Sequence, residues 1–474
     1  MSATKLNLRR RLAVITAVAV SLLVSLVVSA SATSTMNTVI ETVTVGSAPQ
    51  GIAISTDGAF AYVANTSSQT VSKVDLGASP AAVIATIQVG TSPVGVVVTP
   101  DGTRVYVTNF GSNDVSVINT SSNTVIATTP VGPSPVGVAV TPDGTHVFVT
   151  NSGSNTVSVI DTSSNAVSTT IVVGTAPKGI AISPDGLYAL VANYVGNSVS
   201  LITLSNNSVQ DFVSQWGPTS IAIDATSHYA YVTYDDVTNG FSGGAPGFGI
   251  FLLAAPVGLQ GFQAFLQTPF AGAGIALDPS GALGYITNES DNSVTVFNMI
   301  SGAILSTTIP VGSAPIGIAL NPSGARAYVT NSGGSTVSVL DIVVPDPIIT
   351  SVTPASGYEN GGYTIVIAGT GFDSITSVTL GGTACPITVQ SQTSITCSVP
   401  SHATGVVDVT VSGFSKTNTL SASFTFLATT TTSTTSVTTT SSTTSTSSTS
   451  TTSVTGDSSV TTVADDPITP AFTG

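Results

Sequence analysis

The sequence predicts an all-β protein: a seven-bladed β-propeller closed by its N-terminal strand, followed by an Ig-like β-sandwich and a disordered Ser/Thr-rich tail. Three observations lead to this prediction. A pattern of four short strands recurs every 41 to 44 residues in all copies but one, alternating strands with turn signals continue over 348–426, and 429–455 is Ser or Thr except for two valines. The composition agrees, because 7% charged residues, 45 Gly and 25 Pro are typical of short strands joined by tight turns.

The first segment, 1–32, has the features of a secretory signal peptide. Four basic residues precede an apolar run over 12–28, and Ala30 and Ala32 frame a small-x-small cleavage site. At 17 residues the run is also at the lower limit for spanning a bilayer, so an uncleaved anchor is the alternative. Cleavage is favoured, and it predicts a mature chain that is extracellular, either secreted or associated with the cell surface.

The propeller is expected over 33–344. Each unit has an apolar run, a PDG or PSG turn, a strand such as YVTN, a third strand, and a fourth strand that leads into VGxxPxG. Seven copies of the second strand end at Asn65, Asn109, Asn151, Asn193, Tyr234, Asn288 and Asn331. The last unit lacks a fourth strand, and the unpaired strand over 37–46 supplies it. This pairing closes the ring and removes an exposed sheet edge.

The seven copies, in register with PDG before them and VSVID-like strands after them, resemble the YVTN family of β-propellers over 39–341. That family is found in exported bacterial and archaeal surface proteins. The resemblance therefore implies a propeller fold and an exported surface protein.

The Asp and Asn of the repeat are polar enough for chemistry, but their pattern favours structural roles. Copies six and seven replace PDG by PSG, so Asp101 and Asp143 are interpreted as turn residues. The asparagines that end the second strands are expected to form a ring on one face of the propeller. Satisfying local backbone groups is their favoured role, and contacts to a carbohydrate or peptide ligand are the alternative.

The fifth copy is irregular, because 54 residues rather than about 42 separate its innermost strand from the next. Tyr234 takes the place of the Asn and is followed by a Gly-rich loop that contains Asp235, Asp236, Asn239 and Phe241. The two acids lack the alternating ligand spacing of calcium loops, so no metal site is predicted. A plain loop is the favoured interpretation, and a partner-binding loop comes second.

Charge and side-chain chemistry exclude several function classes. The net charge is −14, and four of the nine basic residues lie before residue 12, which argues against nucleic-acid binding. The three His lie in separate units, and the two Glu and four basic residues of the propeller are also dispersed. No acid–base cluster emerges, so we predict no cofactor and no enzyme, with a lactonase or lyase as the least favoured alternative.

The segment 345–428 resembles the IPT/TIG domain, with ITSVTPASGYENGG, IAGTGF, SVTLGG, ITCSVP and VDVTVSG in family order. Cys385 and Cys397 fall on neighbouring strands, and in an exported protein they suggest a disulfide, with two free thiols as the alternative. The tail, 429–474, cannot form a core. It is expected to be a disordered stalk, open to O-glycosylation and to envelope association.

Together these features predict an exported cell-surface or secreted protein that binds or adheres without catalysis. Its partner is an unknown surface protein or carbohydrate. A structural envelope component that packs side by side, as surface-layer proteins do, is the alternative.

Overall fold

The computed structural model describes residues 38–214, 217–234, 247–254, 258–268, 271–299, 304, 308–342, 346–372, 375–391, 393–413 and 416–429. The predicted signal peptide, the tail beyond 429 and the loop residues Asp235, Asp236, Asn239 and Phe241 lie outside these ranges. Within the ranges the named elements are β-strands, as the all-β prediction requires. No helix in this part of the chain is long and apolar enough to cross a membrane.

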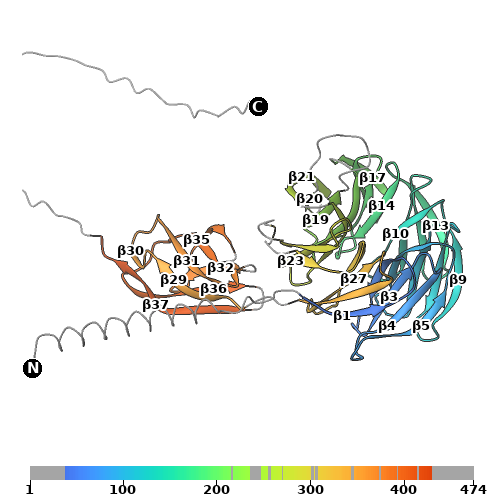
Figure 1. The fold of residues 1–474 in the computed structure, drawn as a ribbon. Helices are drawn as coiled ribbons and strands as arrows, with labels where there is room; N and C mark the ends of the chain where they lie inside the picture. Colours follow the sequence, from blue (N-terminus) through green and yellow to red (C-terminus); the bar gives the residue numbers. More distant parts are fainter. Residues whose placement is uncertain are drawn as a thin grey trace, which may run out of the picture. The chain divides into compact units, whose positions relative to one another are not determined.

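The part of the chain before residue 343 forms seven four-stranded antiparallel sheets among its described residues, here called blades (Figure 1). Blades one to three comprise β2 (Pro49–Ile54), β3 (Phe60–Asn65), β4 (Thr70–Asp75) and β5 (Ala82–Gln88); β6 (Pro93–Val98), β7 (Arg104–Asn109), β8 (Asp114–Asn119) and β9 (Thr124–Pro130); and β10 (Pro135–Val140), β11 (His146–Asn151), β12 (Thr156–Asp161) and β13 (Ala166–Val172). Blades four and five comprise β14 (Pro177–Ile182), β15 (Tyr188–Asn193), β16 (Ser198–Thr203) and β17 (Ser208–Val213); and β18 (Pro218–Ile223), β19 (Tyr229–Tyr234), β20 (Gly247–Ala254) and β21 (Gly258–Gln267). Blades six and seven comprise β22 (Gly272–Leu277), β23 (Leu283–Asn288), β24 (Ser293–Asn298) and β25 (Ile309–Pro310); and β26 (Pro315–Leu320), β27 (Arg326–Asn331), β28 (Thr336–Asp341) and β1 (Thr38–Thr44).

The N-terminal strand closes the ring as the sequence predicts. Strand β1 pairs antiparallel with β28, from Thr44 opposite Thr336 to Thr38 opposite Asp341. The innermost strands contact one another in succession, and β26 of the last blade contacts β2 of the first. In Figure 1, β1 (blue) therefore lies in one sheet with the orange strand β27. Closure places the first and last blades in contact, and it pairs the edge of β28 that would otherwise be exposed.

The apolar residues of the repeat form the cores between blades. Each middle strand is covered on both faces by neighbouring blades, so successive residues such as Tyr106 and Val107 are both fully buried. One core joins Tyr62 and Val71 of the first blade to Val105 and Ile118 of the second. The outermost strands instead alternate between exposed and covered residues, because only one of their faces meets a neighbour.

The PDG segments are turns, as predicted. Asp101 Oδ1 accepts hydrogen bonds from Thr99 Oγ1 (2.5 Å) and from the backbone N–H of Thr103 (3.0 Å), and Gly102 has a φ of 69°. Asp143 makes the same contacts with Thr141 and Thr145. These bonds fold the carboxylate back onto its own turn, which is the structural role that the repeat pattern indicates.

Acid should weaken these turns. Hydrogen bonds from the side chains of Ser55, Thr99 and Thr141 lower the pKa of Asp57, Asp101 and Asp143 below the usual 3.8. A depressed pKa in the folded state contributes stability above pH 3.8, and this contribution is lost as the pH falls through the folded-state pKa. We therefore expect the urea midpoint to fall between pH 4 and pH 2, roughly the titration window of such carboxylates, and to fall less steeply when all three Asp are replaced by Asn. An equally steep decline in the triple variant would contradict this origin.

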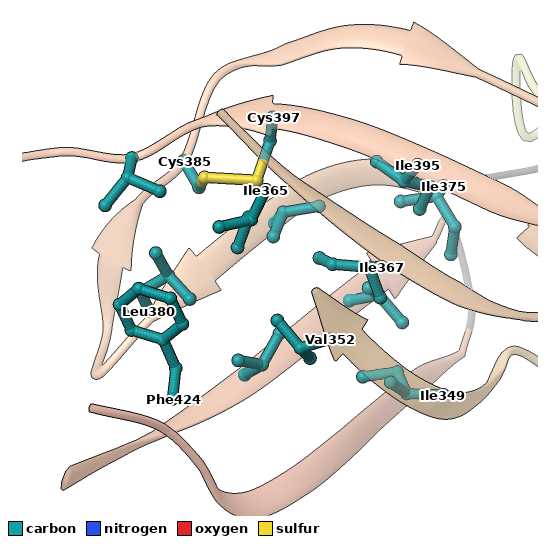
Figure 2. Close-up of a cluster of buried hydrophobic side chains, with 14 of the residues drawn as sticks. Ile349, Val352, Ile365, Ile367, Ile375, Leu380, Cys385, Ile395, Cys397 and Phe424 are labelled. Carbon is teal, nitrogen blue, oxygen red and sulfur yellow. A yellow bond between two sulfur atoms is a disulfide. The ribbon is translucent and has the colours of Figure 1, made fainter. Parts of the chain in front are cut away.

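The residues after 345 form a separate two-sheet sandwich. One sheet has the order β29-β31-β35-β34 and the other β30-β37-β36-β32-β33. Their bounds are β29 (Ile348–Thr353), β30 (Ser356–Tyr358), β31 (Thr364–Thr370), β32 (Ile375–Leu380), β33 (Thr383–Ala384), β34 (Ile387–Gln390), β35 (Ser394–Ser398), β36 (Gly405–Gly413) and β37 (Thr417–Leu427). Figure 2 shows the apolar side chains that fill the space between the sheets, with Ile365 beside the disulfide. The predicted disulfide is confirmed: Cys385 and Cys397 are bonded, with their Cα atoms 5.5 Å apart.

Candidate functional site: the axial pocket of the propeller

At six of the seven blade junctions, the innermost strands approach one another so closely that a Cβ does not fit between them. A Cβ added to Gly51 would lie within 3.0 Å of the carbonyl oxygen of Val94 in the next blade, and one added to Gly137 within 3.0 Å of that of Lys178. The same position is Gly in six blades and Ser220 in the fifth. The backbone therefore lines the axis, and the side chains on either side of these positions decide what the centre can contact.

In four blades the Thr of the YVTN motif ties the inner strand to the next blade, through Thr108, Thr150, Thr287 and Thr330. Thr108 Oγ1 accepts a hydrogen bond from the N–H of Gly95 (2.8 Å) and donates one to the carbonyl of Val136 (2.8 Å). Thr330 repeats this at the junction of the last and first blades, where it donates to Gln50 (2.6 Å). These bonds fix the register of neighbouring inner strands at the four junctions where they occur.

A pocket of about 720 Å³ opens where the inner strands begin, and all seven blades contribute to its lining. Val94, Val136 and Ile316 supply apolar surface, while Lys178 and Glu289 supply the ionisable side chains among the described lining residues. The Lys178 Nζ lies 3.2 Å from the centroid of the Tyr194 ring, a cation–π contact that orients the ammonium. The pocket thus offers backbone, apolar and charged groups converging on one space.

Sequence reasoning missed this convergence. It treated Lys178 and Glu289 as dispersed because they lie in the fourth and sixth units, and the closed ring brings both to one lining. One signal was available: Lys178 occupies the position before the inner-strand glycine, which is Val or Ile in three other blades.

The asparagine side chains that end the second strands lie in the interior of the propeller. The six side chains are not displayed on a face: Asn65, Asn109, Asn151, Asn193, Asn288 and Asn331 are each 0% exposed. Asn65 Nδ2 donates to Thr70 Oγ1 (3.1 Å) and Ser72 Oγ (2.9 Å), and its Oδ1 is buried without a hydrogen-bond partner. Gly46 of the VG connection packs on this side chain, since a Cβ there would lie 2.6 Å from the Asn65 Cγ. The connection covers the Asn and leaves no carboxamide for a ligand at the surface.

Tyr234 is likewise buried rather than available for ligand contact. It is 1% exposed, lies opposite Pro218 in the register, and has its ring centroid 6.0 Å from that of Phe265. Burial raises the pKa of its phenol. Tyr234 therefore fills the core space at the strand end, where the other blades have Asn. In the ranges that the structure describes, no group of three or more His, Cys, Asp or Glu residues is placed to hold a metal ion.

These features define the class of protein: a β-propeller with a backbone-lined axial pocket, followed by an Ig-like domain. Comparison with known families agrees. Residues 27–185 match the YNCE-like beta-propeller family model, and residues 347–428 match the IPT/TIG domain. The chain therefore combines a β-propeller, whose first part matches the YNCE-like model, with an Ig-like domain that matches the IPT/TIG model.

Relatives with known names are similar to limited parts of this chain or to its fold. Fibrocystin-L from Homo sapiens is 38% identical over 71 residues, which is 15% of this chain, and the mouse (Mus musculus) protein is 36% identical over 72 residues. The chain spans about 2% of the length of these curated relatives. Among solved structures, hydrazine synthase from Kuenenia stuttgartiensis aligns with a TM-score of 0.55 at 24% identity, over 63% of this chain and 96% of the other. The β-propeller domain of Cps50 (Swd1) from Myceliophteria thermophila aligns with a TM-score of 0.55 at 11% identity, over 65% of this chain and 100% of the other. These structural likenesses concern the fold alone.

Proposed function

We propose that this chain is an exported, surface-associated protein that binds a ligand without catalysis in the axial pocket of its propeller. The observation that supports this proposal most directly is the pocket of about 720 Å³, to which all seven blades contribute. Its size is in the usual range for ligand sites, and its mixture of apolar surface with few charged groups is typical of them. A closed ring also fixes the lining residues rigidly, which lowers the entropic cost of binding.

Two further features support a location outside the cytoplasm. The buried Cys385–Cys397 disulfide is typical of oxidising compartments, and the IPT/TIG domain is consistent with an extracellular protein. The predicted signal peptide over 1–32 agrees. A carbohydrate or a surface protein is the proposed partner, and the Ser/Thr-rich tail is the proposed link to the envelope.

An array of glycans and peptides probed with the exported, disulfide-bonded chain tests this proposal. Lys178→Met and Glu289→Gln should each weaken capture of the bound class at least about tenfold, because each removes a charged contact from the pocket lining. Lys416→Met is the matched control, since Lys416 pairs with Asp346 (3.0 Å) in the Ig-like domain. Equal capture by all four proteins would overturn the axial site, and turnover of a captured molecule would overturn the non-catalytic assignment.

A structural envelope component is the second candidate, and one observation favours it. The outer strands of three adjacent blades expose Ile at equivalent positions, namely Ile40 (48%), Ile84 (52%) and Ile126 (48%). Such a belt of β-branched residues on edge strands suits side-by-side packing. Cell fractionation separates the two functions, because a lattice protein is among the most abundant surface species and a receptor is not.

A further inference from the structure

At two successive blade junctions, a cation of one blade reaches into the next. In the first blade, Lys73 Nζ donates to the carbonyl of Thr120 (2.8 Å) and to Asn123 Oδ1 (3.1 Å) of the second blade. In the second, the Arg104 guanidinium donates to the carbonyl of Thr162 and to Asn165 Oδ1 of the third. The two cations donate to equivalent acceptors in the two receiving blades. One is the carbonyl of the residue just after the third strand, and the other is the side-chain amide oxygen of the Asn three residues later.

The Lys73 ammonium is bound by two uncharged oxygens of the second blade and by two aromatic rings of its own blade. Lys73 is only 6% exposed, and its Nζ lies 4.3 Å from the centroid of Phe60 and 5.6 Å from that of Tyr62. Loss of hydration lowers the pKa of this ammonium. The hydrogen bonds and the ring faces therefore replace the water that the buried cation gives up.

The junction of the third and fourth blades keeps the acceptors and lacks the cation. Leu204 and Asn207 occupy the places of Thr162 and Asn165, and Asn207 has a φ of 57° where Asn165 has 53°. The place of Lys73 is taken by Val159 and that of Arg104 by His146, whose Nδ1 contacts Thr145 Oγ1 (2.8 Å).

An open cleft results at this junction. The corresponding space at the previous junction, which contains Arg104, measures about 210 Å³, whereas the cleft between the third and fourth blades measures about 710 Å³. Phe148 and Val159 are among its lining residues, and Asn207 is exposed where Asn165 is half-buried.

We propose that this cleft is a binding site for an organic cation, a primary ammonium or a guanidinium on an apolar stem. The Leu204 carbonyl and the Asn207 amide oxygen accept its N–H groups, and the Phe148 ring takes the position that Tyr62 has beside the Lys73 ammonium. Asp143 and Asp185 also line the cleft and add negative charge. The ligand thus occupies the place that the protein fills with its own Lys73 and Arg104 at the two preceding junctions. This site is separate from the axial pocket.

Titration calorimetry of the full chain tests the proposal with defined probes. N-acetyl-arginine methylamide and N-acetyl-lysine methylamide should bind at least about tenfold more tightly than the neutral citrulline analogue, because charge-assisted hydrogen bonds are stronger than neutral ones. Comparing the affinities of agmatine and of an extended peptide with an internal Arg shows whether the bound cation is a small free amine or a side chain of a polypeptide. Equal affinity for the arginine and citrulline probes would overturn the proposal.

Variants that copy the neighbouring junctions make the test specific. Val159→Lys, or His146→Arg if that variant does not fold, should fill the cleft as Lys73 or Arg104 does and reduce binding at least about tenfold. At the previous junction the Tyr106 hydroxyl also donates to Asn165 Oδ1 (2.7 Å), so the double variant Arg104→His/Tyr106→Phe should free both acceptors and raise the stoichiometry from one to two. Lys416→Met, in the Ig-like domain, serves as the control and should bind the probes unchanged. Undiminished binding by a folded, cleft-filling variant would overturn the site.

Discussion

Gly137→Val is expected to lower the free energy of unfolding by about 3 kcal/mol or more, the upper part of the range for overpacking a rigid site. The new Cβ would lie within 3.0 Å of the Lys178 carbonyl oxygen, at 3.0 Å from Thr150 Oγ1 and at 3.2 Å from Ile180 Cγ2. The Lys178 carbonyl oxygen belongs to the backbone, and Thr150 Oγ1 is held by two hydrogen bonds, so neither atom can move away easily. Thr150 Oγ1 accepts the N–H of Gly137 (2.7 Å) and donates to the Lys178 carbonyl (2.7 Å). The inner strands cannot move apart without opening a ring that is closed on both sides.

Equilibrium urea unfolding measures this loss, and the fifth blade supplies the matched control. Ser220 occupies the corresponding position and already carries a Cβ, so Ser220→Ala should change stability by no more than about 0.5 kcal/mol. A similar loss in both variants would show that the close approach at Gly137 is not the cause. A stable Gly137→Val protein would show that the inner strands yield more readily than their packing indicates.

Regular repetition is what made the fold predictable. Each unit carries its own strands and turns, so the 41- to 44-residue period predicts separate four-stranded sheets, and the missing last strand predicts the pairing of β1 with β28. The role of Asp101 follows from comparing copies, because PSG keeps the turn without the carboxylate. Local patterns of this kind depend on neighbours in the chain, which a sequence displays directly.

The candidate sites depend on contacts that the chain makes over long distances. Lys178 and Glu289 line one pocket only because the ring closes, and neither the spacing nor the periodicity of the sequence shows that residues of the fourth and sixth blades share a cavity. The burial of Asn65 is hidden for a similar reason, since Gly46 of the preceding connection covers it. A periodic strand pattern shows that Asn ends a strand, but not that a glycine packs over its carboxamide.

The cleft between the third and fourth blades is only partly predictable from the sequence. The substitution of Val159 for the Lys73 position is readable from aligned copies, but its meaning requires the knowledge that Lys73 reaches Thr120 across a blade junction. Repeats thus help twice. They predict the fold from similarity, and once the structure is known, their differences indicate which junction is open.

Replacing both Cys385 and Cys397 by Ala is expected to destabilise the Ig-like domain by about 3 kcal/mol. The bond joins residues 12 apart in sequence. Closing a loop of about this length lowers the conformational entropy of the unfolded chain, which stabilises the folded state by roughly 3 kcal/mol. Both side chains are also buried in the core that Figure 2 shows, at 1% and 0% exposed, so their truncation leaves unfilled space.

Differential scanning calorimetry of the full chain can assign this effect to one domain. For a domain of this size, a loss of about 3 kcal/mol lowers Tm by more than about 10 °C. The propeller transition serves as the internal control, because its apolar clusters share no residue with the cluster around the disulfide. Reduction of the native protein should reproduce the lower Tm, since it removes the same cross-link while keeping the sulfur atoms in the core. If the double variant loses stability and the reduced protein does not, then the packing of the two sulfur atoms, rather than the covalent bond, stabilises this domain.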